Sequence, residues 1–317
     1  MPAEFLHNRP DFEDLILITG DDQGIDPVLV EKDYWIMHSL FGLQQLGLSF
    51  ELKGGTSLSK GFGIIDRFSE DIDIRIEPPE ELAVSTGRNH SKPAHVESRR
   101  NFYDWLARHI QIDGIVGVER DPAFDDEAQY RSGGIRLAYD SRIGMLEGIK
   151  DGILLEVGFD TVAPNTPRTI TSWAYERGAR SDDFIDNRAV NVACYHPGYT
   201  FVEKLQTLST KFRRQQAEAA FPSNFMRHYY DVYQLLKEPS VIAFVGTPEY
   251  KSHKATRFRA GDNPALTENE AFHLREPGVR KLYRDAFVSS LTLYYRGQPD
   301  FDDVIDTISR AVSGEGF

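Results

Sequence analysis

The chain has 317 residues, of which 40% are hydrophobic and 27% charged, and its formal net charge is −13. A chain of this length can bury a sizeable core and predicts two domains, and the absence of a run of 18 apolar residues argues against a membrane-spanning helix. The acidic charge argues against broad, non-specific nucleic-acid binding, and the single cysteine, Cys194, excludes an internal disulfide. The N-terminus lacks the pattern of a signal peptide, so we expect a cytoplasmic protein without a membrane partner.

The first half of the chain is expected to mix helices and strands. Asp26 is a suitable N-cap and Pro27 suits the first helical position, which predicts a helix over 26–46. Residue patterns then predict strands over 50–52, 71–76, 135–139 and 153–159 and a helix over 94–110. The Pro, Ser, Gly and His residues of 77–92 predict a loop, and 165–167 predict a break.

The second half is expected to be mainly helical from Phe201 onward. The candidate helices cover residues 200–219, 222–237, 266–274, 277–293 and 301–313. The fold class is therefore α/β (α+β), with a mixed β-sheet domain over residues 1–165 and a mainly helical domain over residues 166–317.

Two aspartates on one predicted strand are the first candidate site residues. The segment from Asp71 to Ile76 alternates polar and apolar residues, which is typical of a half-buried strand. Side chains at positions i and i+2 share a face, so Asp71 and Asp73 point the same way. Two neighbouring carboxylates repel each other, and a divalent cation such as Mg²⁺, which prefers hard oxygen ligands, removes that repulsion. The alternative is an exposed strand with an acidic face.

A Gly-Gly-Thr-Ser turn precedes this strand. Gly54 and Gly55 allow the backbone to approach a ligand closely. Thr56 or Ser57 is predicted to cap a helix that begins near Leu58, and free amides at a helix start can bind phosphate. The Walker A and GxGxxG motifs are both absent. The turn and the aspartate pair together favour nucleotidyl transfer.

A third carboxylate is expected from a later strand. Glu156 interrupts the apolar run from Ile153 to Phe159, where a charge is costly unless it is paired or bound to a metal. Asp160 is the alternative, because position i+4 on a strand returns to the same face. A third interpretation is a Glu156 side chain paired to an arginine.

Six segments in order resemble the AbiEii/AbiGii-type nucleotidyltransferase toxin family, which belongs to the DNA polymerase β-like nucleotidyltransferase superfamily. These segments are Val30–Trp35, Lys53–Lys60, Arg67–Asp73, Ile153–Gly158, Thr200–Leu205 and Arg227–Asp231. The resemblance implies a nucleotidyltransferase core in residues 1–165, with a metal site at Asp71, Asp73 and Glu156. It also implies a helical domain that completes the active site.

The resemblance also assigns roles to individual residues. It implies that Lys60 and Lys204 contact the nucleotide, with the turn residues Gly54, Gly55, Thr56 and Ser57, and that Asp231 belongs to the catalytic set. The alternatives are a surface position for Lys204 and an ordinary i, i+4 pair of Asp231 with Arg227.

The function implied by the resemblance is that of a toxin in a toxin–antitoxin or phage-defence system. The enzyme would use Mg²⁺, with Mn²⁺ as a substitute, to transfer NMP from an NTP substrate to an acceptor, which the family suggests is the 3′ acceptor end of tRNA. A cognate antitoxin protein is the expected partner. Two alternatives stay open: modification of a protein hydroxyl, and a non-catalytic NTP-binding partner protein.

Two further features lie outside these motifs. Ser69 lies two residues before Asp71, so on an extended strand it would share the face of Asp71, and its phosphorylation would add negative charge to the metal site. The alternative is a serine at the strand start that bonds to the backbone. The segment Lys251–Arg259 carries four cations and no acid, which predicts either a solvated loop or an RNA contact.

Overall fold

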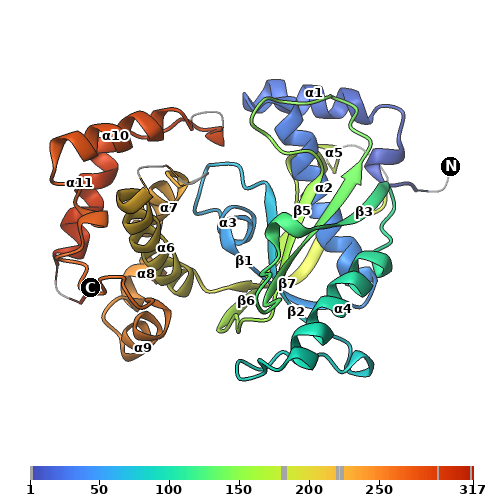
Figure 1. Ribbon diagram of the computed structural model, residues 1–317. Helices are drawn as coiled ribbons and strands as arrows, with labels where there is room; N and C mark the ends of the chain where they lie inside the picture. The colour runs from blue at the N-terminus through green and yellow to red at the C-terminus, as the bar shows by residue number, and fades with distance from the viewer. Residues whose placement is uncertain (1–2, 180–183, 219–220, 222–224, 291–292, 315) are drawn as a thin grey trace. The chain divides into compact units, whose positions relative to one another are not determined.

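The computed structural model describes residues 3–179, 184–218, 221, 225–290, 293–314 and 316–317. The chain divides into two compact units (Figure 1). We call residues 1–63 and 68–195 the sheet unit, and residues 64–67 and 196–317 the helical unit. The chain therefore leaves the sheet unit after Gly63, contributes four residues to the helical unit and returns at Phe68.

The sheet unit is built on one mixed sheet, as expected for the α/β class. Its seven described strands lie in the order β3-β4-β5-β2-β1-β7-β6. The pairs β2–β5 and β1–β7 are parallel and the other neighbours are antiparallel. The strands are β1 (Ser49–Lys53), β2 (Asp71–Glu77), β3 (Ile115–Asp121), β4 (Ser132–Tyr139), β5 (Ile153–Gly158), β6 (Asn165–Ile170) and β7 (Ala189–Tyr195).

Helices cover this sheet. They are α1 (Phe12–Gln23), α2 (Pro27–Gln45), the single turn α3 (Gly54–Thr56), α4 (Pro93–His109) and α5 (Trp173–Gly178). The predicted start of α2 is confirmed, because the Asp26 carboxylate accepts a hydrogen bond from the Val28 amide at 2.9 Å. The helix α2 packs on β5 and β7 and is buried along most of its length, including the charged residues Glu31, Lys32 and Asp33.

The helical unit confirms the predicted mainly helical second half. Its helices are α6 (Pro197–Glu218), α7 (Arg227–Leu235), α8 (Pro239–Phe244), α9 (Pro248–Arg257), α10 (Pro277–Val288) and α11 (Phe301–Val312). Four of them begin with proline, whose fixed φ suits the first turn. The helix α6 contacts α7, α8 and α9. Three predicted helix boundaries involve residues outside the described ones. They are the end of the helix predicted over 200–219, the start of the helix predicted over 222–237 and the end of the helix predicted over 277–293.

Four expectations differ from the structure. Residues 165–167 begin the edge strand β6, where Pro167 is tolerated because an edge strand need not donate every amide to the sheet. The segment 266–274 contains only a 3₁₀ turn at Glu270–Phe272. Most of 251–259 lies in α9 and forms no loop. The units divide after Tyr195 and not after residue 165, because β6 and β7 complete the sheet.

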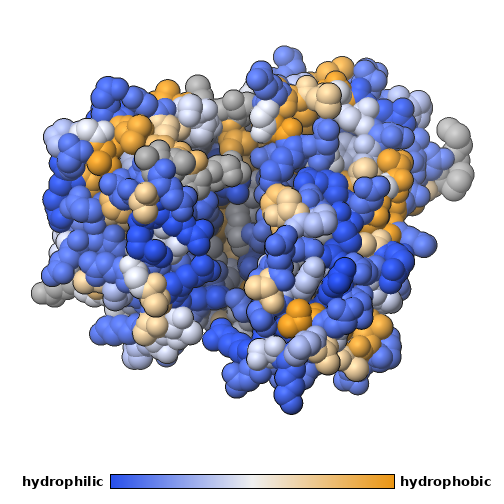
Figure 2. All heavy atoms as spheres, viewed as in Figure 1, coloured by the Kyte–Doolittle hydropathy of each residue, from blue (hydrophilic) through white to orange (hydrophobic). Residues whose placement is uncertain are grey.

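Polar and charged side chains cover most of the visible face of each unit (Figure 2). In the described part of the chain, no helix combines the length and apolarity needed to cross a lipid bilayer.

Candidate active site

The three predicted carboxylates lie on one face of the sheet. Asp71 and Asp73 alternate with buried isoleucines on β2, and Asp73 lies directly opposite Glu156 on the parallel neighbour β5. Residues in register on parallel strands point to the same face, so Asp71, Asp73 and Glu156 share one. Asp160 lies beyond the end of β5 at Gly158. The register therefore favours Glu156 over Asp160 as the third carboxylate.

Burial and the neighbouring aspartates both affect the ionisation of Glu156. Burial, followed by the negative charges of Asp73 and Asp71, raises the pKa of Glu156 to about 7, while Lys150 and Lys53 act in the opposite direction. A carboxyl group with this pKa is partly protonated at neutral pH. A cation bound to these side chains would restore its ordinary ionisation.

The donor chemistry fits a divalent metal, since three carboxylates supply the hard oxygen ligands that Mg²⁺ and Mn²⁺ prefer. Among the described residues, however, no group of three or more His, Cys, Asp or Glu side chains closes around one point in metal-binding geometry. A protein cation lies there instead: the Lys150 ammonium is 3.2 Å from Asp71 Oδ1 and 3.3 Å from Oδ2. Sequence reasoning missed Lys150, which belongs to no motif and lies in a loop.

The glycine turn packs directly against Asp73. Gly54 has φ +71°, and a Cβ atom at this position would lie 2.3 Å from Asp73 Oδ2. Only glycine fits both the backbone conformation and the available space. Gly54 and Gly55 remain partly exposed, so their backbone is accessible to a ligand.

The next two turn residues serve the fold. Thr56 is buried and its hydroxyl donates to the Asp71 carbonyl oxygen, which ties the turn to β2. Ser57 is buried beside the Cys194 thiol. A helical turn does lie over Ser57–Gly61, with Thr56 at its N-cap position, but Thr56 makes no side-chain cap there, and helical structure already begins at Gly54. Phosphate binding by these two side chains stays a prediction.

Lys60, the other predicted nucleotide contact in this unit, is paired in the structure. Its ammonium lies 2.7 Å from Asp33 Oδ1 and 4.9 Å from the centre of the Trp173 ring. Asp33 also accepts a hydrogen bond from the Trp173 amide. Burial raises the pKa of Asp33, and the nearby charge of Lys60 opposes that effect. A nucleotide contact by Lys60 stays a prediction.

The helical unit contains a buried charge cluster around Asp231. Arg67 binds this carboxylate through two bonds, Nε to Oδ1 at 2.6 Å and Nη2 to Oδ2 at 2.7 Å. The Lys204 ammonium lies 2.7 Å from Oδ2. Burial would raise the pKa of Asp231, but the charges of Arg67 and Lys204 outweigh burial and hold it well below its usual range. Asp231 therefore stays ionised.

The cluster connects the two predicted helical-unit residues. Lys204 on α6 and Asp231 on α7 form an ion pair, and a catalytic role for the two residues stays a prediction. Sequence reasoning suggested Arg227 as the partner of Asp231 and overlooked Arg67, which is 164 positions away in the chain. His228 Nδ1 lies 3.5 Å from Lys204 Nζ, and burial followed by the charge of Lys204 lowers the pKa of His228 well below its usual value. His228 is therefore neutral.

Ser69 does not lie on the strand of the aspartates. The strand β2 begins at Asp71, and Ser69 is a half-buried residue of the segment before it. The strand-face argument for its phosphorylation therefore does not hold. Phosphorylation itself stays a prediction, and mass spectrometry of active and inactive protein would test it.

The raised pKa of Glu156 predicts a pH-dependent stability. Between the ordinary glutamate pKa and a folded-state pKa of about 7, the unfolded chain releases a proton that the folded chain retains. This group therefore lowers the free energy of unfolding as pH rises through that window. We expect Glu156→Gln to stabilise the metal-free protein at pH 8, by up to about 3 kcal/mol, and to leave it unchanged at pH 4.5.

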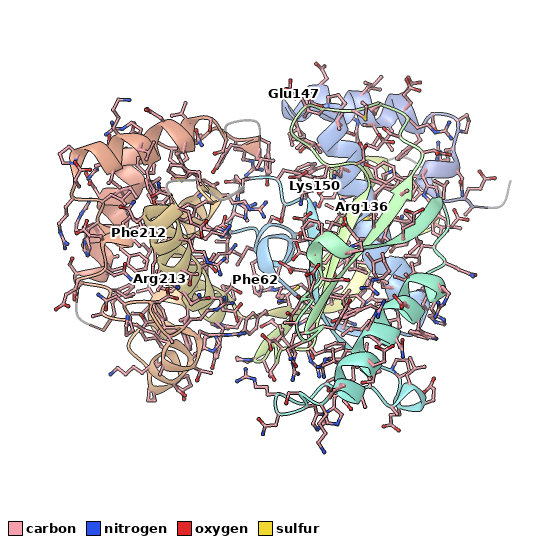
Figure 3. The ribbon with its side chains drawn as sticks, in the orientation of Figure 1. Phe62, Arg136, Glu147, Lys150, Phe212 and Arg213 are labelled. Atoms are coloured by element: carbon pink, nitrogen blue, oxygen red, sulfur yellow. The ribbon has the colours of Figure 1, made fainter. Side chains whose placement is uncertain are left out.

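Urea denaturation at both pH values measures this difference. Glu147→Gln is the matched control, because Glu147 is an exposed residue of the loop between β4 and β5, which Figure 3 labels. An equal effect of the two variants at pH 8 would show that burial and the neighbouring aspartates do not raise the pKa of Glu156.

The model of the family described as "Nucleotidyl transferase AbiEii toxin, Type IV TA system" matches residues 35–307. No curated protein matches the chain. Among solved structures, it is similar to an antigenic nucleotidyltransferase-like protein from Paracoccidioides brasiliensis, at 11% identity over 87% of this chain and 93% of that chain, with a TM-score of 0.36. Because the family model spans most of its length, the chain belongs to the AbiEii family of nucleotidyltransferase toxins of type IV toxin–antitoxin systems.

Proposed function

We propose that the protein transfers NMP from an NTP to an acceptor hydroxyl, with Asp71, Asp73 and Glu156 holding a divalent metal. The register that sets Asp73 opposite Glu156, with Gly54 against Asp73, is the observation that carries this proposal. A bound Mg²⁺ or Mn²⁺ ion would supply Lewis-acid stabilisation of the charge that develops on the phosphates.

The chain's own residues would position the nucleotide. The partly exposed backbone of Gly54 and Gly55 lies beside Asp73, where it can approach the phosphates closely. Lys204 would neutralise phosphate charge, and Asp231 would orient its ammonium through their 2.7 Å ion pair. In this proposal Arg67 is a positioning residue, because it holds both oxygens of the Asp231 carboxylate.

We further propose the 3′ acceptor end of tRNA as the acceptor, in the cytoplasm, and a cognate antitoxin protein as the partner that restrains the toxin. The family supports the toxin role. A local basic surface supports an RNA acceptor despite the net charge of −13: Lys251, Lys254 and Arg259 line a cavity of about 620 Å³ beside α9. The acidic total keeps a protein hydroxyl as the second candidate acceptor, and a non-catalytic NTP-binding protein as the third possibility.

A labelling experiment separates these candidates. Each NTP, labelled at the α-phosphate, is incubated with total RNA and with total protein, using wild type and Asp73→Ala. We expect label on RNA, concentrated in the tRNA fraction and lost on removal of the 3′ terminal nucleotides, and no label with Asp73→Ala. Label on protein would support the second acceptor. Intact NTP binding without transfer to either pool would contradict the proposed activity.

A further inference from the structure

The loop between β4 and β5, residues 140–152, places a lysine on the carboxylate site. The Lys150 ammonium contacts both oxygens of Asp71, at 3.2 and 3.3 Å, and lies 5.1 Å from the centre of the Phe124 ring. The side chain is 31% exposed, whereas the Asp71 side chain is 10% exposed. Lys150 is therefore the accessible partner of a nearly buried carboxylate.

Buried charges fix both ends of this loop. At its start, the Glu31 carboxylate on α2 accepts hydrogen bonds from the Ser141 hydroxyl at 2.6 Å and the Arg142 amide at 2.8 Å. At its end, the Lys150 amide donates to Glu70 Oε2 at 2.9 Å, and the Lys32 ammonium donates to the Lys150 carbonyl oxygen. These contacts hold the backbone of Lys150 and do not involve its side chain.

Open space lies next to Lys150. This residue lines a cavity of about 310 Å³, together with Lys32, Tyr139, Ile149 and Gly152. Figure 3 labels Lys150 and Glu147 on this loop, with Arg136 on the neighbouring strand β4. Because the anchors use backbone atoms of Lys150, its ammonium can move while the loop stays in place.

We propose that Lys150 is a resident counter-ion of the carboxylate site, which competes with the divalent metal for Asp71 and sets the metal affinity of the free protein. This inference rests on the proposed metal site. An ammonium at this position neutralises one of three neighbouring carboxylates, and it repels a second cation brought to the same oxygens. Metal binding must therefore displace it, and the displacement lowers the apparent affinity.

Titration of the nucleotide-free full-length protein with Mn²⁺ tests the proposal, with free Mn²⁺ followed by electron paramagnetic resonance. We expect Lys150→Met to bind Mn²⁺ about tenfold more tightly than wild type. Lys150→Arg, which keeps the charge, should bind as wild type does. The matched control Lys92→Met makes the same change in net charge at an exposed position before α4. Equal affinities of Lys150→Met and Lys92→Met, or weaker binding by Lys150→Met, would overturn the proposal.

A measurement on the wild type does not depend on any variant folding. Acetylation of individual lysines by a limiting reagent, read by mass spectrometry, reports how accessible each amine is. Saturating Mn²⁺ should raise the labelling rate of Lys150 severalfold relative to Lys92, because the ammonium leaves Asp71. An unchanged ratio would refute displacement.

The Asp73→Ala variant distinguishes this inference from the proposed function. Loss of Mn²⁺ binding in Asp73→Ala, combined with unaltered affinity in Lys150→Met, would refute only the counter-ion role. Wild-type Mn²⁺ binding by Asp73→Ala would refute the metal site itself, and the counter-ion role with it.

Discussion

Replacing Asp73 with asparagine should reduce nucleotidyl transfer by a factor on the order of 10³ or more while leaving the fold intact. Asparagine has the shape of aspartate, so the close contact with Gly54 is kept. It removes one of the negative charges that raise the pKa of Glu156, so repulsion within the site falls. The free energy of unfolding of the metal-free protein at pH 8 should therefore not decrease, and transfer should fail because the metal loses a ligand.

Transfer of α-phosphate label to the acceptor and urea denaturation provide the two measurements. Asp160→Asn is the matched control, because Asp160 lies past the end of β5 and was the other candidate for the third carboxylate. We expect its activity to stay within about twofold of wild type. More than a tenth of wild-type activity in Asp73→Asn, or equal losses in the two variants, would contradict the assignment of Asp73.

Replacing Asp231 with asparagine should destabilise the helical unit by about 3–5 kcal/mol. The carboxylate is fully buried and accepts two bonds from Arg67 and one from Lys204. Without its charge, two cations stay buried with no compensating anion, and their desolvation is no longer offset. This mechanism predicts a loss of stability at every pH at which Asp231 is ionised, which includes neutral pH because its pKa is depressed.

The matched variant Lys204→Met separates stability from catalysis. It keeps the two-bond pair of Arg67 with Asp231, so we expect a loss of only about 1 kcal/mol in stability but a large loss of transfer. Denaturation followed by circular dichroism, combined with the transfer assay, gives both quantities. If Asp231→Asn unfolds at the same urea concentration as wild type, the buried cluster does not support the fold as described.

The local parts of the candidate site could be predicted from the sequence because their signals are local. The alternation from Asp71 to Ile76 predicts both the strand and the shared face, and the apolar run around Glu156 predicts a buried strand. Their pairing in register was not predicted from the residues, because it depends on tertiary structure. The helix α2 was found from its capping aspartate and its first-position proline.

The parts that were missed depend on distant partners or on overlooked local signals. Arg67 acquires its role from Asp231, which follows 164 residues later, and Lys150 acquires its role only when its loop folds over Asp71. Pro167 predicts a break at 165–167, whereas pairing with β7 makes this segment part of the edge strand β6. The helix α9 could have been found, since Thr247 caps it and Pro248 begins it.

The four residues 64–67 determine how this protein can be divided. They lie early in the chain but belong to the helical unit, where the Asp66 amide donates to the Tyr230 hydroxyl at 3.0 Å and Arg67 binds Asp231. A fragment covering residues 196–317 would contain Asp231 and Lys204 but would lack Arg67, the second cation that pairs with Asp231. During translation, Arg67 is synthesised 164 residues before its partner Asp231. The helical unit therefore depends on residues from both sides of the segment 68–195 in the sequence: the pair of Arg67 with Asp231 forms only after residues 68–195 have been translated.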